Sequence, residues 1–246
     1  KDINVELIKD FRFYLETQEA SKDQYGHTKK MSDNTKSTYF SLFKSALSQA
    51  FDNGYFTTNI VAFVDGFKKP ETRREYLTID ELNKLAHTPC KSEDTKRAAL
   101  FSALTGLRHC DLYKLMWKEI VESNDNVQLH FEQKKTKGIE YMPISIQARS
   151  ICGERKKDYE LVFPGLSTAG HASECIKNWL KDAGITRNIT FHCFRHTFAT
   201  LQLANGTDLY TISKMLGHRD ITTTQIYTHI VDQKKEKAAN SITLNL

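Results

Sequence analysis

Three separated segments of the 246-residue chain carry side chains that could act on a phosphate ester. They read TGLRHCDL, QKKTKG, and HCFRHTFAT followed by LGHRDITTTQIYTH. Each segment alone says little, because arginines, lysines and tyrosines are common on protein surfaces. Together they supply two guanidinium groups, an amine, two imidazoles and a phenol: Arg108, Lys135, His192, Arg195, His218 and Tyr227.

Guanidinium groups suit the chemistry of a phosphodiester. The diester is an anion, and nucleophilic attack concentrates further negative charge on its nonbridging oxygens. Arg108 and Arg195 can each donate two parallel hydrogen bonds to such oxygens, and loss of one donor group typically costs about 3 to 4 kcal/mol. Asp111 follows Arg108 by three residues, which on a helix places both on one face, so that the carboxylate can orient the guanidinium.

Tyr227 is the candidate nucleophile. A tyrosine that attacks phosphorus in line becomes a phosphotyrosine, which conserves the energy of the broken bond for rejoining and requires neither ATP nor a metal ion. We therefore expect no cofactor. The ordinary pKa of the phenol is about 10, so that attack at neutral pH needs surrounding cations or a base, and His192 or His218 could take the proton.

The order of these residues resembles the tyrosine recombinase (phage integrase) family along essentially the whole chain. That family has an arginine in a TGLR turn, a hairpin lysine, a His-x-x-Arg box, a histidine after Leu-Gly and a nucleophilic tyrosine nine residues later. The resemblance implies that Tyr227 forms a 3′-phosphotyrosine and that Lys135 protonates the leaving 5′ oxygen. Lys135 is preferred to Lys134 and Lys137 because Lys-Thr begins eight residues before Pro143, as in the family's hairpin.

The first 68 residues predict a small helical core-binding domain. Apolar residues recur at helical spacing over residues 7–15, 39–51 and 60–64. The first two stretches are separated by the polar segment SKDQYGHTKKMSDN, and Asn34 or Thr35 is the expected N-cap of the second helix. The basic segment at residues 69–75 is typical of an extended linker.

Residues 76–246 predict a catalytic domain that ends in a C-terminal tail at 232–246. Thr78 and Glu81 have the spacing of a capping box. Further helices are expected from about Thr95 to Gly106, from Arg108 through Met116, and from Thr168 onward, with helix stops at Gly184, Gly206 and Gly217. Residues 127–144 alternate in polarity around KKTKG, which predicts a β-hairpin with a lysine-rich turn. The fold class is therefore mainly α with a small antiparallel β hairpin or sheet, and the resemblance implies a two-domain, C-shaped DNA clamp.

Composition is consistent with a globular, mildly basic protein. The chain has 35 Lys+Arg against 30 Asp+Glu, a net charge of +5, and 39% hydrophobic residues, which excludes collagenous and wholly disordered classes. We find no apolar run long enough to span a bilayer and no signal-peptide layout at the start. Five widely spaced cysteines suggest reduced thiols. We expect a cytoplasmic, nucleoid-associated bacterial protein without a membrane partner.

The expected partner is double-stranded DNA carrying recombination sites. The linker would cross phosphates, and the start of the second helix and the hairpin turn would supply further contacts; the candidate residues are Thr35, Lys36, Tyr39, Lys68, Lys69, Arg73, Arg74, Lys134 and Lys137. The resemblance implies an integrase of a mobile element that acts as a tetramer on DNA, with the tail docked on a neighbour, in some systems with a DNA-bending accessory protein.

Three alternatives remain open from the sequence. A type IB topoisomerase uses similar chemistry without paired sites, and a noncatalytic DNA-binding regulator would keep the fold without the reaction. A zinc site is a third, because His192 and His196 stand four residues apart, next to Cys193 and with His218 and His229 further along. It is disfavoured because Arg195 would place a fixed cation beside the metal; His196 and His229 are better explained as packing or hydrogen-bonding residues.

Overall fold

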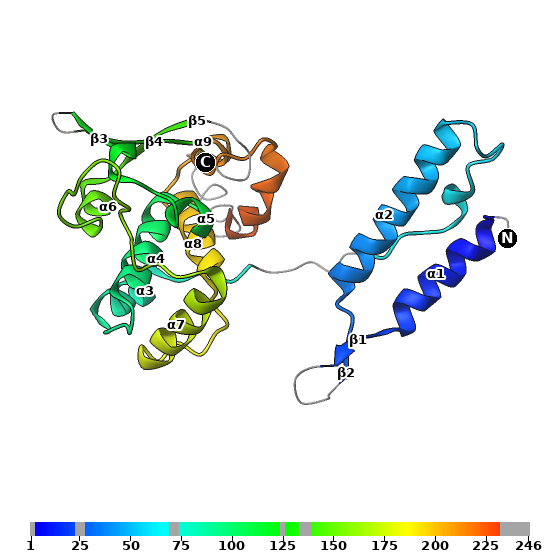
Figure 1. The fold of residues 1–246 in the computed structure, drawn as a ribbon, viewed down its shortest axis with the longest axis horizontal. Coiled ribbons are helices and arrows are strands. Elements are labelled where there is room, and N and C mark those ends of the chain that lie inside the picture. The colour runs from blue at the N-terminus through cyan, green and yellow to red at the C-terminus, as the bar shows by residue number, and fades with distance from the viewer. Residues whose placement is uncertain (1–2, 23–27, 69–73, 124–125, 133–138, 232–246) are drawn as a thin grey trace, which may run out of the picture. The chain divides into compact units, whose positions relative to one another are not determined.

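The computed structural model describes residues 3–22, 28–68, 74–123, 126–132 and 139–231 (Figure 1). The chain divides into two compact units, residues 1–73 and 74–246. Within the described residues both units are mainly helical, and the second contains a three-stranded antiparallel sheet. The predicted fold class, mainly α with a small antiparallel sheet, is confirmed. None of the described helices is long and apolar enough to cross a membrane.

The first unit is built from two helices joined by a hairpin. Its elements are α1 (Val5–Thr17), β1 (Glu19–Lys22), β2 (Thr28–Lys30), α2 (Asp33–Asp52) and the 3₁₀ helix η1 (Ile60–Phe63). Burial of the apolar stripes of α1, α2 and η1 against one another makes its core, which consists of Ile8, Leu15, Phe40, Leu47, Val61 and Val64.

The structure differs from the predictions made from the sequence in three places within this unit. The hairpin β1–β2 occupies the segment that the sequence describes only as polar, because that segment lacks the apolar alternation of a half-buried strand. The N-cap of α2 is Ser32, whose hydroxyl accepts a hydrogen bond from the amide of Thr35 at 3.2 Å, and not Asn34 or Thr35. The short helix at 60–64 is a single 3₁₀ turn.

The second unit contains the remaining elements. They are α3 (Ile79–His87), α4 (Glu93–Thr105), α5 (His109–Leu112), η2 (Trp117–Glu119), β3 (Ile120–Ser123), β4 (Asn126–Glu132), β5 (Ile139–Ile144), α6 (Ile146–Ile151), α7 (Ala169–Asp182), α8 (Phe191–Ala204), α9 (Leu209–Met215), η3 (Ile221–Thr223) and η4 (Gln225–Val231). The predicted capping box is present: the amide of Thr78 donates to Glu81 at 2.8 Å, and the amide of Glu81 donates to Thr78 at 3.2 Å.

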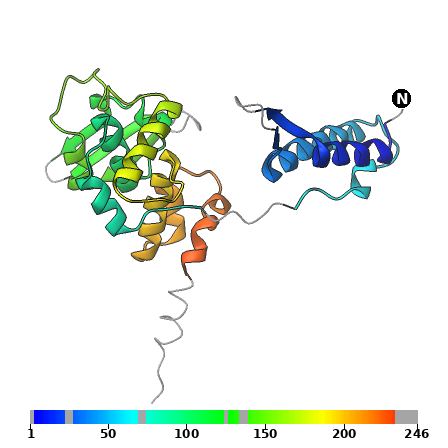
Figure 2. The ribbon, with the colours of Figure 1, turned by 90° about the horizontal axis from the view of Figure 1, so that it is seen from below.

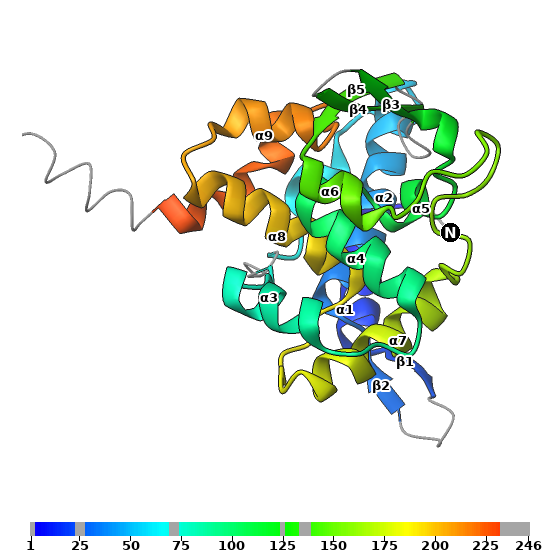
Figure 3. The same cartoon turned by 90° about the vertical axis from the view of Figure 1, so that its left-hand side faces the viewer.

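Helix α8 is the centre of this unit. Ten of its fourteen residues are buried, so the helix has no exposed face along most of its length. It lies beside α4, as Figure 3 shows, and α9 and η4, orange to red in Figure 2, pack on it as well. Residues on α8 are therefore held by neighbours on several sides, which makes it a rigid support for functional side chains.

The sheet has the order β3-β4-β5, with Leu129 opposite Met142 in the central register. The expected hairpin is β4–β5, and β3 adds a strand that the sequence did not predict. The lysine-rich turn expected between β4 and β5, residues 133–138, lies outside the described residues.

The helix predicted from Arg108 through Met116 is only four residues long. Beyond Leu112 the backbone turns to another segment: the amide of Trp117 donates to the carbonyl of Glu160 at 3.0 Å, and the amide of Val162 donates to Leu115 at 2.9 Å. These bonds replace the helical ones, while Leu115 and Trp117 stay buried. The apolar spacing was therefore correct for burial and wrong for the length of the helix.

Candidate active site

Arg195 on α8 joins the ends of two other helices. The residue is only 3% exposed. Nη1 donates to the carbonyl of Gly106, the C-cap of α4, at 2.5 Å, and Nη2 donates to the carbonyl of Leu216, the C-cap of α9, at 2.7 Å. Carbonyls at helix C-termini lack intrahelical partners and attract cations. Arg195 thereby fixes the starts of the turns that carry Arg108 and His218.

Gly106 is required by the close packing of this turn. Its φ is +73°, a left-handed conformation that favours glycine. A Cβ atom added here would lie 2.6 Å from Cδ1 of Phe198 and 2.8 Å from Cδ2 of Leu216, both in the packed interior around α8. The TGLR turn can therefore approach α8 only with glycine at this position.

Gly106→Ala should destabilise the second unit strongly. The left-handed backbone costs about 1–2 kcal/mol for a residue with a side chain, and overpacking adds about 1–3 kcal/mol. Gly206→Ala is the matched control, because Gly206 also has a positive φ, +102°, but no atom lies within 4 Å of its added Cβ. Urea unfolding should show the larger loss for Gly106→Ala. Equal losses would mean that the turn does not depend on close packing against α8.

His218 is held on both ring nitrogens. Its Nε2 lies 3.0 Å from Nη2 of Arg195, and its Nδ1 lies 2.8 Å from the hydroxyl of the fully buried Thr224. A guanidinium only donates, so Nε2 accepts and Nδ1 carries the proton. These contacts give His218 one tautomer and one orientation beside Arg195.

Arg108 is the N-cap residue of α5, and its Nη1 lies 3.9 Å from Oδ2 of Asp111, which is 1% exposed. Burial and the neighbouring charge of Arg108 lower the pKa of Arg195 to about 10, which still leaves the guanidinium protonated at neutral pH. Two cations are thus held together within a mostly buried site. Asp111 offsets part of their repulsion, and a bound phosphate would offset more of it.

Tyr227 on η4 is buried, with 3% of its surface exposed. Its hydroxyl lies 2.7 Å from Nδ1 of His196, the residue after Arg195. Burial raises the pKa of the phenol, and the charges of Arg195, Arg74 and Arg108 act in the opposite direction. The positive charges of these three arginines therefore act on the hydroxyl.

The remaining motif residues differ in how well they are placed. His192 is exposed at the first turn of α8, and its ring meets that of His196 edge-on, with centroids 4.5 Å apart. Lys134, Lys135 and Lys137 lie outside the described residues, as does the side chain of His229. Within the part of the chain that the structure describes, no group of three His, Cys, Asp or Glu side chains could hold a metal ion.

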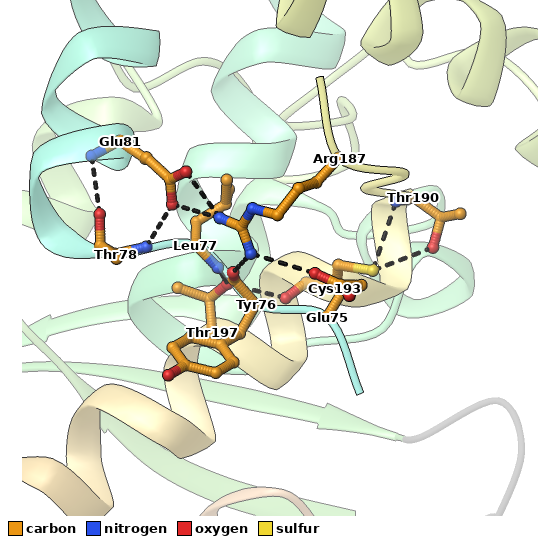
Figure 4. A network of polar contacts seen from close by, with 9 residues as sticks. All are labelled: Glu75, Tyr76, Leu77, Thr78, Glu81, Arg187, Thr190, Cys193 and Thr197. Atoms are coloured by element: carbon orange, nitrogen blue, oxygen red, sulfur yellow. Dashed lines mark hydrogen bonds and ion pairs between the residues drawn. The ribbon is translucent and has the colours of Figure 1, made fainter. Parts of the chain in front are cut away.

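A polar network fixes the segment at residues 74–78, which precedes α3 in the second unit (Figure 4). Nη1 of Arg187 donates to Glu75 at 3.0 Å and to the carbonyl of Tyr76 at 2.8 Å, while Nη2 donates to both carboxylate oxygens of Glu81 at 2.5 and 2.6 Å. Bonds with the guanidinium and the amide of Thr78 outweigh burial, so that the pKa of Glu81 is lowered. Arg187 thus ties this segment to the capping box of α3.

A second contact brings the same segment to α8. The buried amide of Leu77 donates to the hydroxyl of Thr197 at 2.9 Å, one residue after His196 along the helix. Arg74, three residues before Leu77, consequently lies close enough to lower the pKa of both His196 and Tyr227 through its charge. Arg74 was predicted as a DNA-contacting linker residue, and the structure adds a position beside the candidate nucleophile.

Two members of this site were missed as functional residues. The sequence predicts only a packing or hydrogen-bonding role for His196, and the structure shows a hydrogen bond with Tyr227. Spacing could not identify Tyr227 as the partner, because the two residues are 31 positions apart. Thr224 gave no signal at all. Of the other predicted DNA contacts, Tyr39 and Lys68 are exposed, whereas Thr35 and Lys36 are partly buried, and Lys36 pairs with Asp33 at 3.4 Å. Lys69 and Arg73 lie outside the described residues.

Comparison with known proteins finds two matching family models and several similar sequences. The model of the phage integrase family matches residues 75–234, and that of the phage integrase SAM-like domain matches residues 1–69. Tyrosine recombinase XerD of Listeria innocua is 28% identical over 214 residues, covering 78% of this chain and 70% of the relative. Tyrosine recombinase XerC of Lactobacillus leichmannii is 34% identical over 148 residues, or 54% and 48% of the two chains.

Solved structures of recombinases share the fold. The XerH site-specific recombinase in a post-cleavage complex with palindromic difH substrate has a TM-score of 0.73 and 19% identity, covering 98% of this chain and 72% of that one. A lambda integrase tetramer bound to a Holliday junction has a TM-score of 0.60 and 25% identity, covering 92% and 64%. Because the family model matches most of its length, the chain belongs to the phage integrase family, the tyrosine site-specific recombinases.

Proposed function

We propose that this protein cuts and rejoins DNA at specific sites through a covalent 3′-phosphotyrosine on Tyr227. The observation that carries the proposal is the junction at Arg195, which joins the Arg108 turn to the His218 turn and whose charge acts on the phenol of Tyr227. Guanidinium groups and a buried phenol gathered at one place are suited to attack on a phosphodiester.

Each group has a role in the proposed reaction. Arg108 and Arg195 bind the nonbridging oxygens of the scissile phosphate, and Asp111 orients Arg108. His218 and His192 support the phosphate and the proton movements. The bond from Tyr227 to phosphorus forms as the bond to the 5′ oxygen breaks; His192 or His218 takes the proton that the phenol loses, and Lys135 donates the proton that the 5′ oxygen takes up. The reverse sequence rejoins the strand without ATP, a metal ion or another cofactor.

The biological setting is proposed from the relatives. We assign the chain to integration and excision of a mobile element in the bacterial cytoplasm, on nucleoid DNA, with four protomers on two duplexes. The lambda integrase tetramer on a Holliday junction supports this assembly. The two units would form a C-shaped clamp, divided as 1–68, a basic linker at 69–75, and 76–246, with the tail at 232–246 on a neighbour and, where needed, a DNA-bending partner.

The proposed DNA contacts follow the same division. The start of α2 and the linker would contact phosphates and grooves on one side, and the hairpin turn on the other. The residues are Thr35, Lys36, Tyr39, Lys68, Lys69, Arg73, Arg74, Lys134 and Lys137.

The test begins with a library of nicked duplexes of randomised sequence, from which the protein selects its own site by covalent capture. Two supercoiled plasmids then serve as substrates in EDTA, one with two copies of the selected site and one with none. A recombinase should resolve only the first plasmid into two circles. Relaxation of both plasmids would instead show a topoisomerase, and binding of the duplex library without any covalent capture would show a noncatalytic regulator.

A further inference from the structure

The candidate nucleophile has a specific hydrogen-bond partner that no catalytic motif of the sequence includes. Oη of Tyr227 lies 2.7 Å from Nδ1 of His196. Both side chains are buried, with 3% and 6% of their surfaces exposed. His196 is on the rigid helix α8, directly after Arg195, whereas Tyr227 is on η4. The contact with His196 therefore fixes the hydroxyl relative to α8, the helix that also carries Arg195.

The other two histidines of the site do not offer this contact. Nε2 of His218 accepts from Arg195, and its Nδ1 is bonded to Thr224, so both nitrogens are engaged. His192 is exposed, and it meets the ring of His196 edge-on. In the part of the chain that the structure describes, His196 is thus the histidine that reaches the phenol.

Electrostatics determine the direction of this hydrogen bond. Burial, followed by the charges of four neighbours, lowers the pKa of His196 to about 3; these neighbours are His192, Arg74, Arg195 and His218. The ring is therefore neutral at ordinary pH. Burial also raises the pKa of Tyr227, so the phenol keeps its proton and can donate it to Nδ1. In that arrangement the lone pairs of the phenol oxygen are not occupied by the histidine and remain available to a phosphorus atom.

The hydroxyl is within reach of the charges of arginines that the proposed function assigns to the phosphate. The charges of Arg195, Arg74 and Arg108 all act on the phenol, and two of these residues belong to the set proposed to bind the phosphate. We propose, building on the function above, that His196 is a positioning residue for Tyr227, which it holds through Nδ1 beside the arginines that receive the scissile phosphate. Misplacement of a reacting group by about 1 Å can reduce a rate by about 10²-fold.

Three substitutions test which atom matters. His196→Asn keeps a hydrogen-bonding atom one bond beyond Cγ, where Nδ1 is; His196→Gln moves it one bond further, towards the place of Nε2; His196→Ala removes it. At saturating site DNA, with the covalent adduct quenched over time, Asn should stay within about threefold of the wild type. Gln and Ala should be slower by about tenfold to 100-fold, with DNA affinity unchanged in all three.

Two results would overturn the proposal. If Asn is as slow as Ala, the acceptor position does not matter. If Ala is as fast as the wild type or faster, the contact restrains the nucleophile and does not position it. A wild-type protein that binds its site without forming an adduct would instead contradict the proposed function, and the rates would then carry no information on His196.

The contact can also be tested without DNA. This measurement remains possible if the wild-type protein forms no adduct or if a His196 variant does not fold. With ¹⁵N-labelled histidine, Tyr227→Phe should shift the Nδ1 resonance of His196, because it removes the hydrogen bond and leaves the histidine in place. Tyr210→Phe, which changes an exposed tyrosine of α9, is the control and should leave that resonance unchanged. An Nδ1 resonance that Tyr227→Phe does not move would overturn the proposal at its geometric basis.

Acid provides a second check on the neutral histidine. The pKa of His196 is about 3 in the folded protein and 6.5 without the fold, so between these values the unfolded chain binds a proton that the folded protein does not. The contribution of a neutral His196 to stability is therefore full above about pH 6.5 and is lost as the pH falls towards 3. Wild-type stability should fall more steeply over this window than that of His196→Asn; parallel curves would contradict a neutral His196.

Discussion

Arg195→Gln should reduce the rate of covalent cleavage by about 10²–10³-fold, the loss typical of one donor to a developing anion. The substitution removes the charge and the branched donor set that reaches Gly106 and Leu216. The protein should still fold, because each carbonyl left without a partner costs about 1–3 kcal/mol and the repulsion between Arg195 and Arg108 is relieved. Single-turnover adduct formation on the selected site, alongside urea unfolding, measures both effects.

Arg195→Lys is the informative control. Lysine keeps a positive charge, but its single amine cannot donate from two separate nitrogens to Gly106 and Leu216 as the planar guanidinium does. We expect it to remain at least about tenfold slower than the wild type. Full activity with lysine would show that charge alone is needed here, and that the junction of the two turns is not part of the mechanism.

Tyr227→Phe should abolish the covalent adduct while leaving DNA binding intact. The substitution removes one oxygen from a buried ring, so it costs about 1 kcal/mol through the lost bond to His196 and takes away the proposed nucleophile. Tyr210→Phe should form adduct at the wild-type rate, since Tyr210 is 61% exposed on α9. Electrophoretic binding and denaturing gels on the same labelled duplex separate the two properties.

Residual adduct in Tyr227→Phe would place the nucleophile elsewhere. Loss of DNA binding in the same variant would show that the phenol serves the DNA interface, and the missing adduct could then not be attributed to chemistry.

The sequence predicted which side chains lie together better than it predicted how they are held. Arg108, Arg195 and His218 stand in short motifs whose spacing is local, and the structure brings them together. The atoms that hold them are different in kind: backbone carbonyls of Gly106 and Leu216 accept from Arg195. Carbonyls are present at every residue, so no pattern of side chains marks which of them a buried guanidinium will bind.

The misjudged elements have similar causes. The helix predicted beyond Arg108 is short because Leu115 and Trp117 pair with a segment some 45 positions away, a tertiary contact that outweighs local helical spacing. The polar hairpin β1–β2 lacks the alternation by which strands are recognised. The sequence did not link His196 to Tyr227, and it assigned Arg74 to DNA alone. Both contacts depend on how α8, η4 and the segment at residues 74–78 pack, which side-chain spacing does not reveal.

If Tyr227 becomes joined to DNA, mapping the adduct will show it most directly. Wild-type protein is incubated with the selected nicked duplex in EDTA, denatured and digested with trypsin and nuclease, and the nucleotide-bearing peptide is sequenced by mass spectrometry. Cleavage after Arg219 and Lys234 gives a peptide of residues 220–234, in which Tyr227 is the single tyrosine. We expect a 3′-linked nucleotide on Tyr227; a nucleotide on another residue, or an adduct that EDTA prevents, would contradict the proposed mechanism.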